Sequence, residues 1–185
     1  MPASPQILAR YEERIRQTLE ELGIPVTEAT KRRLSLHLEC EDLVSIGPDQ
    51  AGREQRLERA AAAQWQVMRD TAGSEGVVLA AVSAFRSVDY QRQIIARKLA
   101  AGQSLEQILR VSALPGFSEH HSGRAIDIGT SGCAPLTEAF EQTAAYRWLT
   151  QHAQAFGFRL SYPRGNPHGV VFEPWHWVYS EANPS

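Results

Sequence analysis

The stretch SEHHSGRAIDIG, residues 118–129, places an aspartate in the middle of a short apolar run that is typical of a β-strand. Side chains of a strand alternate between two faces, so Asp127 shares its face with Ala125 and Gly129 while two isoleucines occupy the other. A buried carboxylate is costly unless a cation, a metal ion or several hydrogen-bond donors satisfy it. The small neighbours leave space for such a partner. Taken alone, however, the run is more simply explained by an aspartate that caps a turn at the end of a strand.

Helical periodicity dominates the N-terminal part of the chain. Apolar residues recur at helical spacing over three stretches, which end near Gly23, Leu43 and Ala72. We therefore expect residues 1–75 to form a helical extension that packs on a core formed by residues 76–185.

From residue 76 onward, patterns of short strands and helices are mixed. We expect strands at 77–85, 124–129, 158–163 and 170–179, and helices over 89–102, after the N-cap Ser104 and from the N-cap Thr137 to Gly157. This mixture indicates an α+β fold with a small, mostly antiparallel sheet flanked by helices and an N-terminal helical layer.

The composition is that of an ordinary globular domain. The 185 residues are 43% hydrophobic and 22% charged, with a formal net charge of -2. This balance offers no basic surface for nucleic acid or an anionic membrane, and no apolar run approaches the ~20 residues of a membrane span. Cys40 and Cys133 lie far apart in no metal-binding pattern, so we expect two buried thiols.

The start of the chain shows no basic segment followed by an apolar one. This predicts a cytoplasmic location, or a periplasmic or secreted one if a leader precedes the given chain. The sequence does not specify an oligomeric state.

A second segment with candidate chemistry is FEPWHWVY, residues 172–179. Glu173 and His176 are three positions apart, so a regular strand would place them on opposite faces. Pro174 removes a hydrogen-bond donor and favours a bend, which would let the two side chains converge. Taken alone, this segment is also well explained as an aromatic edge strand with a surface glutamate and a packed histidine.

Together the two segments supply the groups of a catalytic zinc site. Two imidazoles and a carboxylate, with a fourth position open to water, are what a catalytic Zn²⁺ needs, and Glu173 is the remaining carboxylate that could act as general base on that water. The chain has no HExxH motif, and we expect the HLE at residues 37–39 to lie on the surface of a helix.

Arg86 directly follows the predicted strand at residues 77–85. An arginine there is commonly solvated, but its planar fork could also bind a substrate carboxylate through two hydrogen bonds. Gln91 follows about one helical turn later and could orient it.

These segments, in this order, resemble the zinc D-Ala-D-Ala carboxypeptidases, a group that includes the vancomycin-resistance carboxypeptidases and bacterial L,D-carboxypeptidases. The family pattern SxHxxGxAxD is matched by residues 118–127, its ExxH by residues 173–176, and its SGYRS by residues 83–87. The resemblance covers roughly residues 76–180. Ala84 and Phe85 replace the glycine and tyrosine of SGYRS, so a tyrosine hydroxyl is missing.

The resemblance implies that His120, Asp127 and His176 bind one Zn²⁺ per chain. It implies that Glu173 is the catalytic base. His121 occupies a variable position of the pattern, and we expect it to be a neighbour of the cleft rather than a ligand.

The resemblance also implies a set of substrate-binding residues. Arg86 would stabilise the polarised carbonyl oxygen or hold the terminal carboxylate, and Ser118 would hydrogen-bond that carboxylate. Gln91 and Tyr162 would contribute to substrate binding at the pocket wall.

The implied activity is removal of a C-terminal D-alanine from peptidoglycan stem peptides or muropeptides, by D,D- or L,D-carboxypeptidase action. Two alternatives stay open at this point: a peptidoglycan endopeptidase that cuts L-Ala-D-Glu bonds, and a zinc-containing peptide-binding module without catalysis. The presence of Glu173 argues against the binding module, because such a module needs no base beside its metal.

Overall fold

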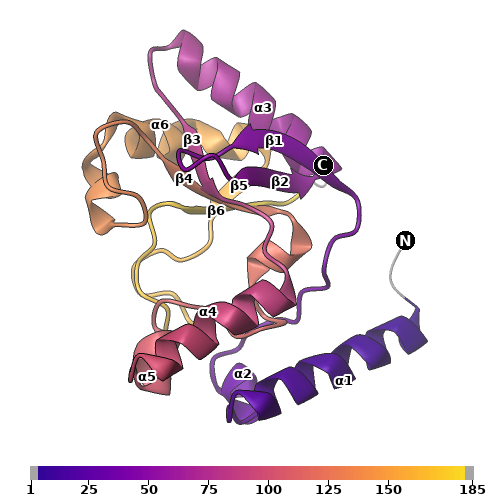
Figure 1. Cartoon of the computed structure of the whole chain (residues 1–185). Helices are drawn as coiled ribbons and strands as arrows, with labels where there is room; N and C mark the ends of the chain where they lie inside the picture. Colours follow the sequence, from indigo (N-terminus) through magenta and orange to yellow (C-terminus); the bar gives the residue numbers. More distant parts are fainter. Residues whose placement is uncertain (1–3, 182–185) are drawn as a thin grey trace.

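Short strands and helices alternate along the chain, and the computed structural model describes them for residues 4–181. Within these residues the strands are β1 (Leu43–Pro48), β2 (Glu54–Glu58), β3 (Ala80–Ser83), β4 (Ala125–Gly129), β5 (Phe158–Leu160) and β6 (His176–Tyr179). The helices are α1 (Pro5–Glu21), α2 (Thr27–Lys31), α3 (Arg59–Ser74), α4 (Val88–Ala100), α5 (Leu105–Leu109) and α6 (Ala144–His152), with 3-10 turns η1 (Glu119–Ser122), η2 (Glu138–Gln142) and η3 (Ala153–Phe156). A four-stranded antiparallel sheet in the order β3-β4-β6-β5 forms the centre, and the β1–β2 hairpin packs beside α3 (Figure 1). The expected α+β fold is confirmed.

The main apolar core joins one face of the four-stranded sheet to helices α3 and α6. Ile126 and Ile128 of β4 belong to this buried cluster, as do Trp65 of α3 and Trp148 of α6. Leu57 of β2 is also a member and is completely buried. Residues on both sides of the boundary predicted after residue 75 therefore share one core.

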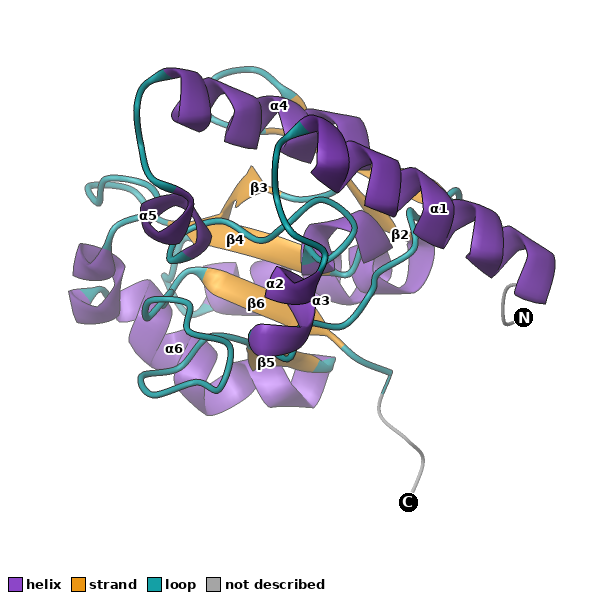
Figure 2. Cartoon of the chain, turned by 90° about the horizontal axis from the view of Figure 1, so that it is seen from below, coloured by secondary structure: helices purple, strands orange, loops and turns teal. Residues whose placement is uncertain are grey.

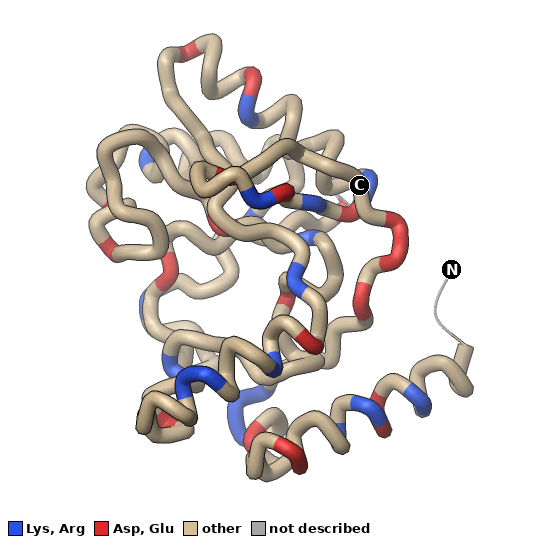
Figure 3. The backbone as a smooth tube through the Cα atoms, viewed as in Figure 1, with Lys and Arg blue, Asp and Glu red and all other residues tan. Residues whose placement is uncertain are grey.

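A second apolar cluster joins α1 to α4 and α5, on the side of the molecule away from α3 and α6 (Figures 1 and 2). Ile15 and Leu19 of α1 are buried in it together with Val88 and Ile95 of α4. Acidic and basic residues are interspersed along the rest of α1 (Figure 3). The N-terminal helix is thus amphipathic, with its apolar side against α4 and α5.

The second predicted helix ends at Lys31 rather than near Leu43, and the third, predicted from about Gln50, was wrong up to residue 58, because residues 43–58 form the β1–β2 hairpin. Asp49 closes the turn between the two strands, because its Oδ1 accepts the backbone N–H groups of Ala51 and Arg53, both at 2.9 Å. Such side-chain-to-backbone bonds favour a turn over a helix. The third predicted helix therefore begins only at Arg59.

The segment that contains residues 37–39 has no regular secondary structure, so its expected place on a helix surface was also wrong. The N–H of His37 donates to the carbonyl of Gly116, and that of Cys40 donates to the carbonyl of His121. Pairing with a distant loop is a tertiary contact, and local periodicity cannot reveal it.

The predicted helix from Thr137 to Gly157 is divided into η2, α6 and η3. Thr137 stands at the N-cap position of η2 but its side chain makes no capping bond there, whereas the Thr143 hydroxyl caps α6 by accepting the N–H of Tyr146 at 3.1 Å. The last predicted strand is shorter than expected and covers only residues 176–179, because the chain turns at Pro174.

Other expectations hold at residue level. Ser4 caps α1, and Ser104 forms a capping box with Gln107 at α5. Cys40 and Cys133 are unpaired as expected, but both are half-buried rather than buried. No helix within residues 4–181 combines the length and apolar character needed to cross a bilayer.

Candidate functional site

Three neighbouring strands bring the central side chains of the site together. Asp127 on β4 lies directly opposite His176 on β6 and opposite Ser83 on β3. Residues paired across antiparallel strands project to the same face of the sheet. The opposite face of β4 carries the two isoleucines of the main core. Asp127 therefore lies on the face of the sheet away from that core, as the alternation in the sequence predicted.

His120 reaches this face from the 3-10 turn η1. Its Nδ1 lies 2.6 Å from the carbonyl oxygen of Ala84, an acceptor, so Nδ1 carries the proton. The unprotonated Nε2 then faces Oδ2 of Asp127 at 3.3 Å. Two lone-pair-bearing atoms thus point at each other with no proton between them, an arrangement that a metal cation relieves.

Gly123 ends η1 and allows the loop to reach the sheet. Its φ of +67° is in the left-handed region, and a Cβ there would lie 2.9 Å from the backbone nitrogen of Glu58. That same nitrogen donates a hydrogen bond to the Gly123 carbonyl. Glycine is required here both by backbone conformation and by this close approach.

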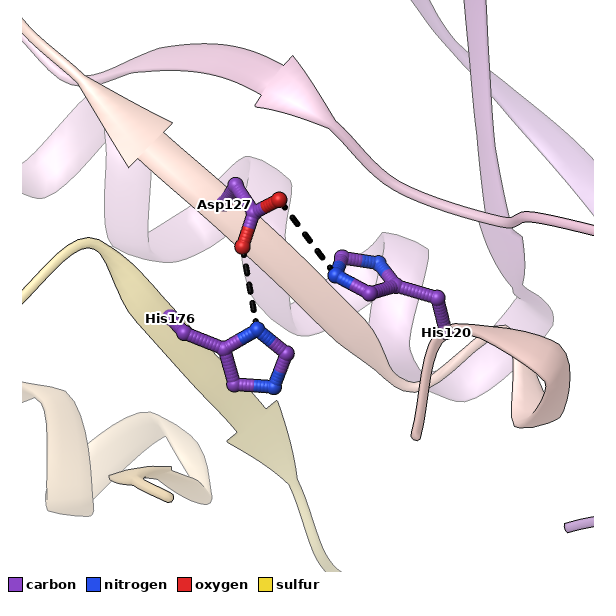
Figure 4. Close-up of side chains that lie close together, drawn as sticks. All are labelled: His120, Asp127 and His176. Carbon is purple, nitrogen blue, oxygen red and sulfur yellow. Dashed lines mark hydrogen bonds and ion pairs between the residues drawn. The ribbon is translucent and has the colours of Figure 1, made fainter. Parts of the chain in front are cut away.

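The ligand atoms fit a single metal ion. Nδ1 of His176 lies 3.0 Å from Oδ1 of Asp127, and the ligand atoms of His120, Asp127 and His176 all lie within 4.8 Å of one another (Figure 4). Ligands bound tetrahedrally at ~2.1 Å are separated by roughly 3.4 Å, close to the distances found here. All three side chains are buried.

The protonation of the three groups differs. Burial, helped by Arg86, lowers the pKa of His120 to about 4, so its ring is neutral at pH 7, as a metal ligand must be. Burial disfavours the charged ring of His176, but in the metal-free site hydrogen bonds to two carboxylates outweigh it and raise its pKa to about 10, so a metal ion bound at Nδ1 would displace a proton. Burial likewise opposes ionisation of Asp127, but the two imidazoles hold its pKa well below the usual range.

Glu119 is a member of the site that the sequence did not identify. Its Oε2 accepts a hydrogen bond from Nε2 of His176 at 2.9 Å, which turns Nδ1 of that ring toward Asp127. Burial alone would raise the pKa of Glu119, but the hydrogen bond from His176 lowers it to about 2. The only sequence feature that could have indicated it is its place next to His120, because the motif leaves that position variable. Carboxylates that orient metal-binding histidines in this way are common around metal sites.

Glu173 lies at the bend that precedes β6. Its backbone carbonyl accepts the N–H of His176, and its carboxylate lies 4.0 Å from Nδ1 of that ring, so the two side chains converge as the sequence predicted. Burial, together with the negative charges of Asp127 and Glu119, raises the pKa of Glu173 to about 7. A carboxylate with this pKa can accept and return a proton near neutrality.

Arg86 is held beside the candidate metal ligands. Its guanidinium donates to Oε1 of Gln91 at 3.1 Å, to Oγ of Ser83 at 3.0 Å and to Oδ2 of Asp127 at 3.4 Å. Gln91 is completely buried and donates its amide to the carbonyl of Ala113 at 2.7 Å. Gln91 thus orients Arg86, as the sequence suggested, but it does not line the cavity, which argues against the expected substrate contact.

His121 has a structural role and does not line the cavity. Its Nδ1 donates to the carbonyl of Arg86, and its Nε2 accepts the N–H of Gly116 at 3.0 Å. Burial lowers the pKa of this ring to about 4, which keeps it in the neutral form that these two bonds require. The two adjacent histidines are therefore not equivalent.

A cavity of about 410 Å³ opens in front of the three candidate ligands. Of the residues predicted for the site, it is lined by Arg86, Ser118, His120, Asp127, Tyr162, Glu173 and His176. The ring of Tyr162 lies 4.9 Å from that of His176 between centroids, and Ser118 is 2% exposed. The cavity joins a candidate metal-binding cluster, a candidate base and cationic side chains in one space.

Comparison with known proteins identifies the relatives of this arrangement. The sequence model of the VanY family, described as D-alanyl-D-alanine carboxypeptidase, matches residues 54–182. A protein of Bacillus subtilis (strain 168), provisionally named carboxypeptidase YodJ, is 36% identical over 127 residues, which are 66% of this chain and 46% of the relative.

Two solved structures share the fold. The LdcB LD-carboxypeptidase, whose structure addresses peptidoglycan recognition, has a TM-score of 0.68 and 34% identity over 76% of this chain and 69% of its own. A point mutant of the vancomycin-resistance D,D-pentapeptidase VanY, solved in complex with Zn(II), has a TM-score of 0.57 and 27% identity, over 78% of this chain and 86% of its own. The chain thus spans about half the length of the Bacillus relative and most of each of these two structures.

Proposed function

The chain belongs to the VanY family of D-alanyl-D-alanine carboxypeptidases, and from this membership we propose that it is a zinc-dependent peptidase that removes a C-terminal D-alanine from peptidoglycan-derived peptides. The observation that carries the proposal is the convergence of His120, Asp127 and His176 with Glu173 at one cavity. This is the donor set of a catalytic zinc site with a base beside it. Relatives solved with Zn(II) or with reference to peptidoglycan recognition support both the metal and the substrate class.

Each residue has a role that follows from its position. When bound, Zn²⁺ polarises the scissile carbonyl and acidifies a water molecule. Glu173, 4.0 Å from a ligand nitrogen, accepts the proton of the attacking water and passes it to the leaving amine. Arg86, fixed by Gln91 and Ser83, donates to the carbonyl oxygen as negative charge develops there.

The test is incubation of the purified protein with three substrates: a pentapeptide ending in D-Ala-D-Ala, a tetrapeptide ending in one D-alanine, and free D-Ala-D-Ala. Products are identified by mass with and without a chelator. We expect D-alanine release from at least one substrate, its loss with the chelator and its return on addition of zinc. Release from none of the three would overturn the proposal, and the pattern of release assigns D,D-, L,D- or dipeptidase action.

A further inference from the structure

Three lysine and arginine side chains line the cavity: Arg53, Arg86 and Lys98. Arg53 pairs with Asp49 at 2.7 Å, and Arg86 lies 3.4 Å from Asp127. Lys98 has no carboxylate within 4.0 Å among residues 4–181, and its Nζ donates to Oγ of Ser112 at 2.6 Å. It is the one of the three whose charge is not matched by an acid.

The position of Lys98 on α4 directs it into the cavity. Tyr90, Ile94 and Lys98 follow one another at intervals of four residues, so they lie on one face of the helix, and all three line the cavity. The same helix carries Gln91, which holds Arg86. One helix therefore positions both the arginine at the metal ligands and the ammonium group further along the wall.

The surroundings of Lys98 make its lone charge unfavourable without a ligand. Its side chain is half-buried, and burial lowers its pKa; Arg86 lowers it further, while Glu173 raises it. A partly desolvated ammonium with only a neutral hydroxyl partner gains from an incoming anion. Arg86 is already engaged by Ser83, Gln91 and Asp127, so it is committed to the metal side of the cavity.

We propose that Lys98, with Ser112 beside it, joins Ser118 in binding the C-terminal carboxylate of the substrate, which leaves Arg86 for the scissile carbonyl. This inference rests on the proposed function. A carboxypeptidase must recognise both the terminal carboxylate and the carbonyl of the residue before it. The inference assigns the carboxylate to Lys98 and the carbonyl to Arg86, and so decides between the two roles that were open for Arg86.

The test compares Lys98→Met with Arg97→Met, its neighbour on α4. Arg97 is exposed and donates to the Gln93 carbonyl within its own helix, so the control removes one charge without touching the cavity. Each variant is assayed with the peptide that the unaltered protein hydrolyses, supplied once with a free C-terminal carboxylate and once as the C-terminal carboxamide. For the free acid we expect kcat/KM of Lys98→Met to fall about 10- to 100-fold, mainly through KM, as for loss of one hydrogen bond to a charged group.

The carboxamide separates carboxylate binding from a merely structural effect. It should be a poor substrate for the unaltered protein and no poorer for Lys98→Met, whereas Lys98→Arg should recover part of the activity on the free acid. The inference about Lys98 would be overturned, with the proposed function left standing, by either of two results. One is equal activity of Lys98→Met and Arg97→Met on the free acid, and the other is a preference of Lys98→Met for the free acid over the carboxamide as strong as that of the unaltered protein. Hydrolysis of neither peptide by the unaltered protein would overturn the proposed function and the inference with it. If methionine lowers the melting temperature, Lys98→Gln repeats the comparison.

Discussion

Replacing Gly123 with alanine separates two demands that the loop before β4 places on this residue. The first is the backbone conformation, a φ of +67°, which costs an L-residue roughly 1–2 kcal/mol. The second is space, because the new Cβ would meet the backbone nitrogen of Glu58 at 2.9 Å, and a backbone atom cannot move aside as a flexible side chain can. Overpacking of this kind costs about 1–3 kcal/mol. We therefore expect the free energy of unfolding to fall by about 2–5 kcal/mol.

Gly23 provides the matched control for this prediction. Its φ is +68°, but nothing lies within 4 Å of the position that a Cβ would take. Gly23→Ala should therefore show only the conformational cost of roughly 1–2 kcal/mol. Both variants are compared with the unaltered protein by urea unfolding, with the metal removed so that zinc binding does not contribute.

The difference between the two variants is the measured cost of the close approach at Glu58. Zinc affinity provides a second readout, because Gly123 ends the turn that carries His120, whereas Gly23 lies at the end of α1. We expect Gly123→Ala to weaken zinc binding and Gly23→Ala to leave it unchanged. Equal destabilisation by the two substitutions would refute the reasoning, since it would show that the loop relaxes away from Glu58 without loss.

Further predictions concern protons at the site. Glu173→Gln should lower kcat about 10²- to 10⁴-fold, the usual range for loss of a general base. Its zinc content, measured by atomic emission, should stay near that of the unaltered protein. Retained turnover would contradict the role of Glu173. In the metal-free protein the pKa of His176 is raised from an ordinary value near 6.5 to about 10. The stability this provides is fully present below pH 6.5 and is lost as the pH rises through 10, so unfolding free energy should fall over that range. Glu119→Gln should shift this loss of stability to lower pH, because it removes one of the two carboxylates bonded to His176. The control Arg159→Gln removes only an exposed partner 3.9 Å from Glu119 and should cause no such shift. Unfolding curves at several pH values distinguish these outcomes, and identical shifts in both variants would count against the assignment.

Local sequence patterns determined the parts of the site that depend on one strand or one bend. Alternation along residues 124–129 placed Asp127 on the face opposite two isoleucines, and the strand is found there. Pro174 predicted the bend that brings Glu173 to His176. Both inferences follow from backbone geometry over a few residues, which the sequence specifies directly.

Contacts between distant segments were beyond these patterns. The second strand of the β1–β2 hairpin was mistaken for the start of a helix because Leu57 also fits the helical spacing of α3, and the side chain of Asp49 decides the turn. Glu119 was not identified because it stands at a variable position of the motif and its partner, His176, is 57 residues away in sequence. The place of Lys98 in the cavity depends on how α4 packs against the loop that contains Ser112.

The sequence by itself thus determined the candidate ligands, the base and the α+β class, because each depends on residue type and short-range periodicity. Only the tertiary structure decided that His121 supports the loop through Gly116 and Arg86, that the carbonyl of Ala113 anchors Gln91, and that Glu119 holds His176. The physical reason is that a hydrogen bond or a buried charge depends on where two segments meet, and the pairing of strands β3, β4 and β6 sets that meeting point.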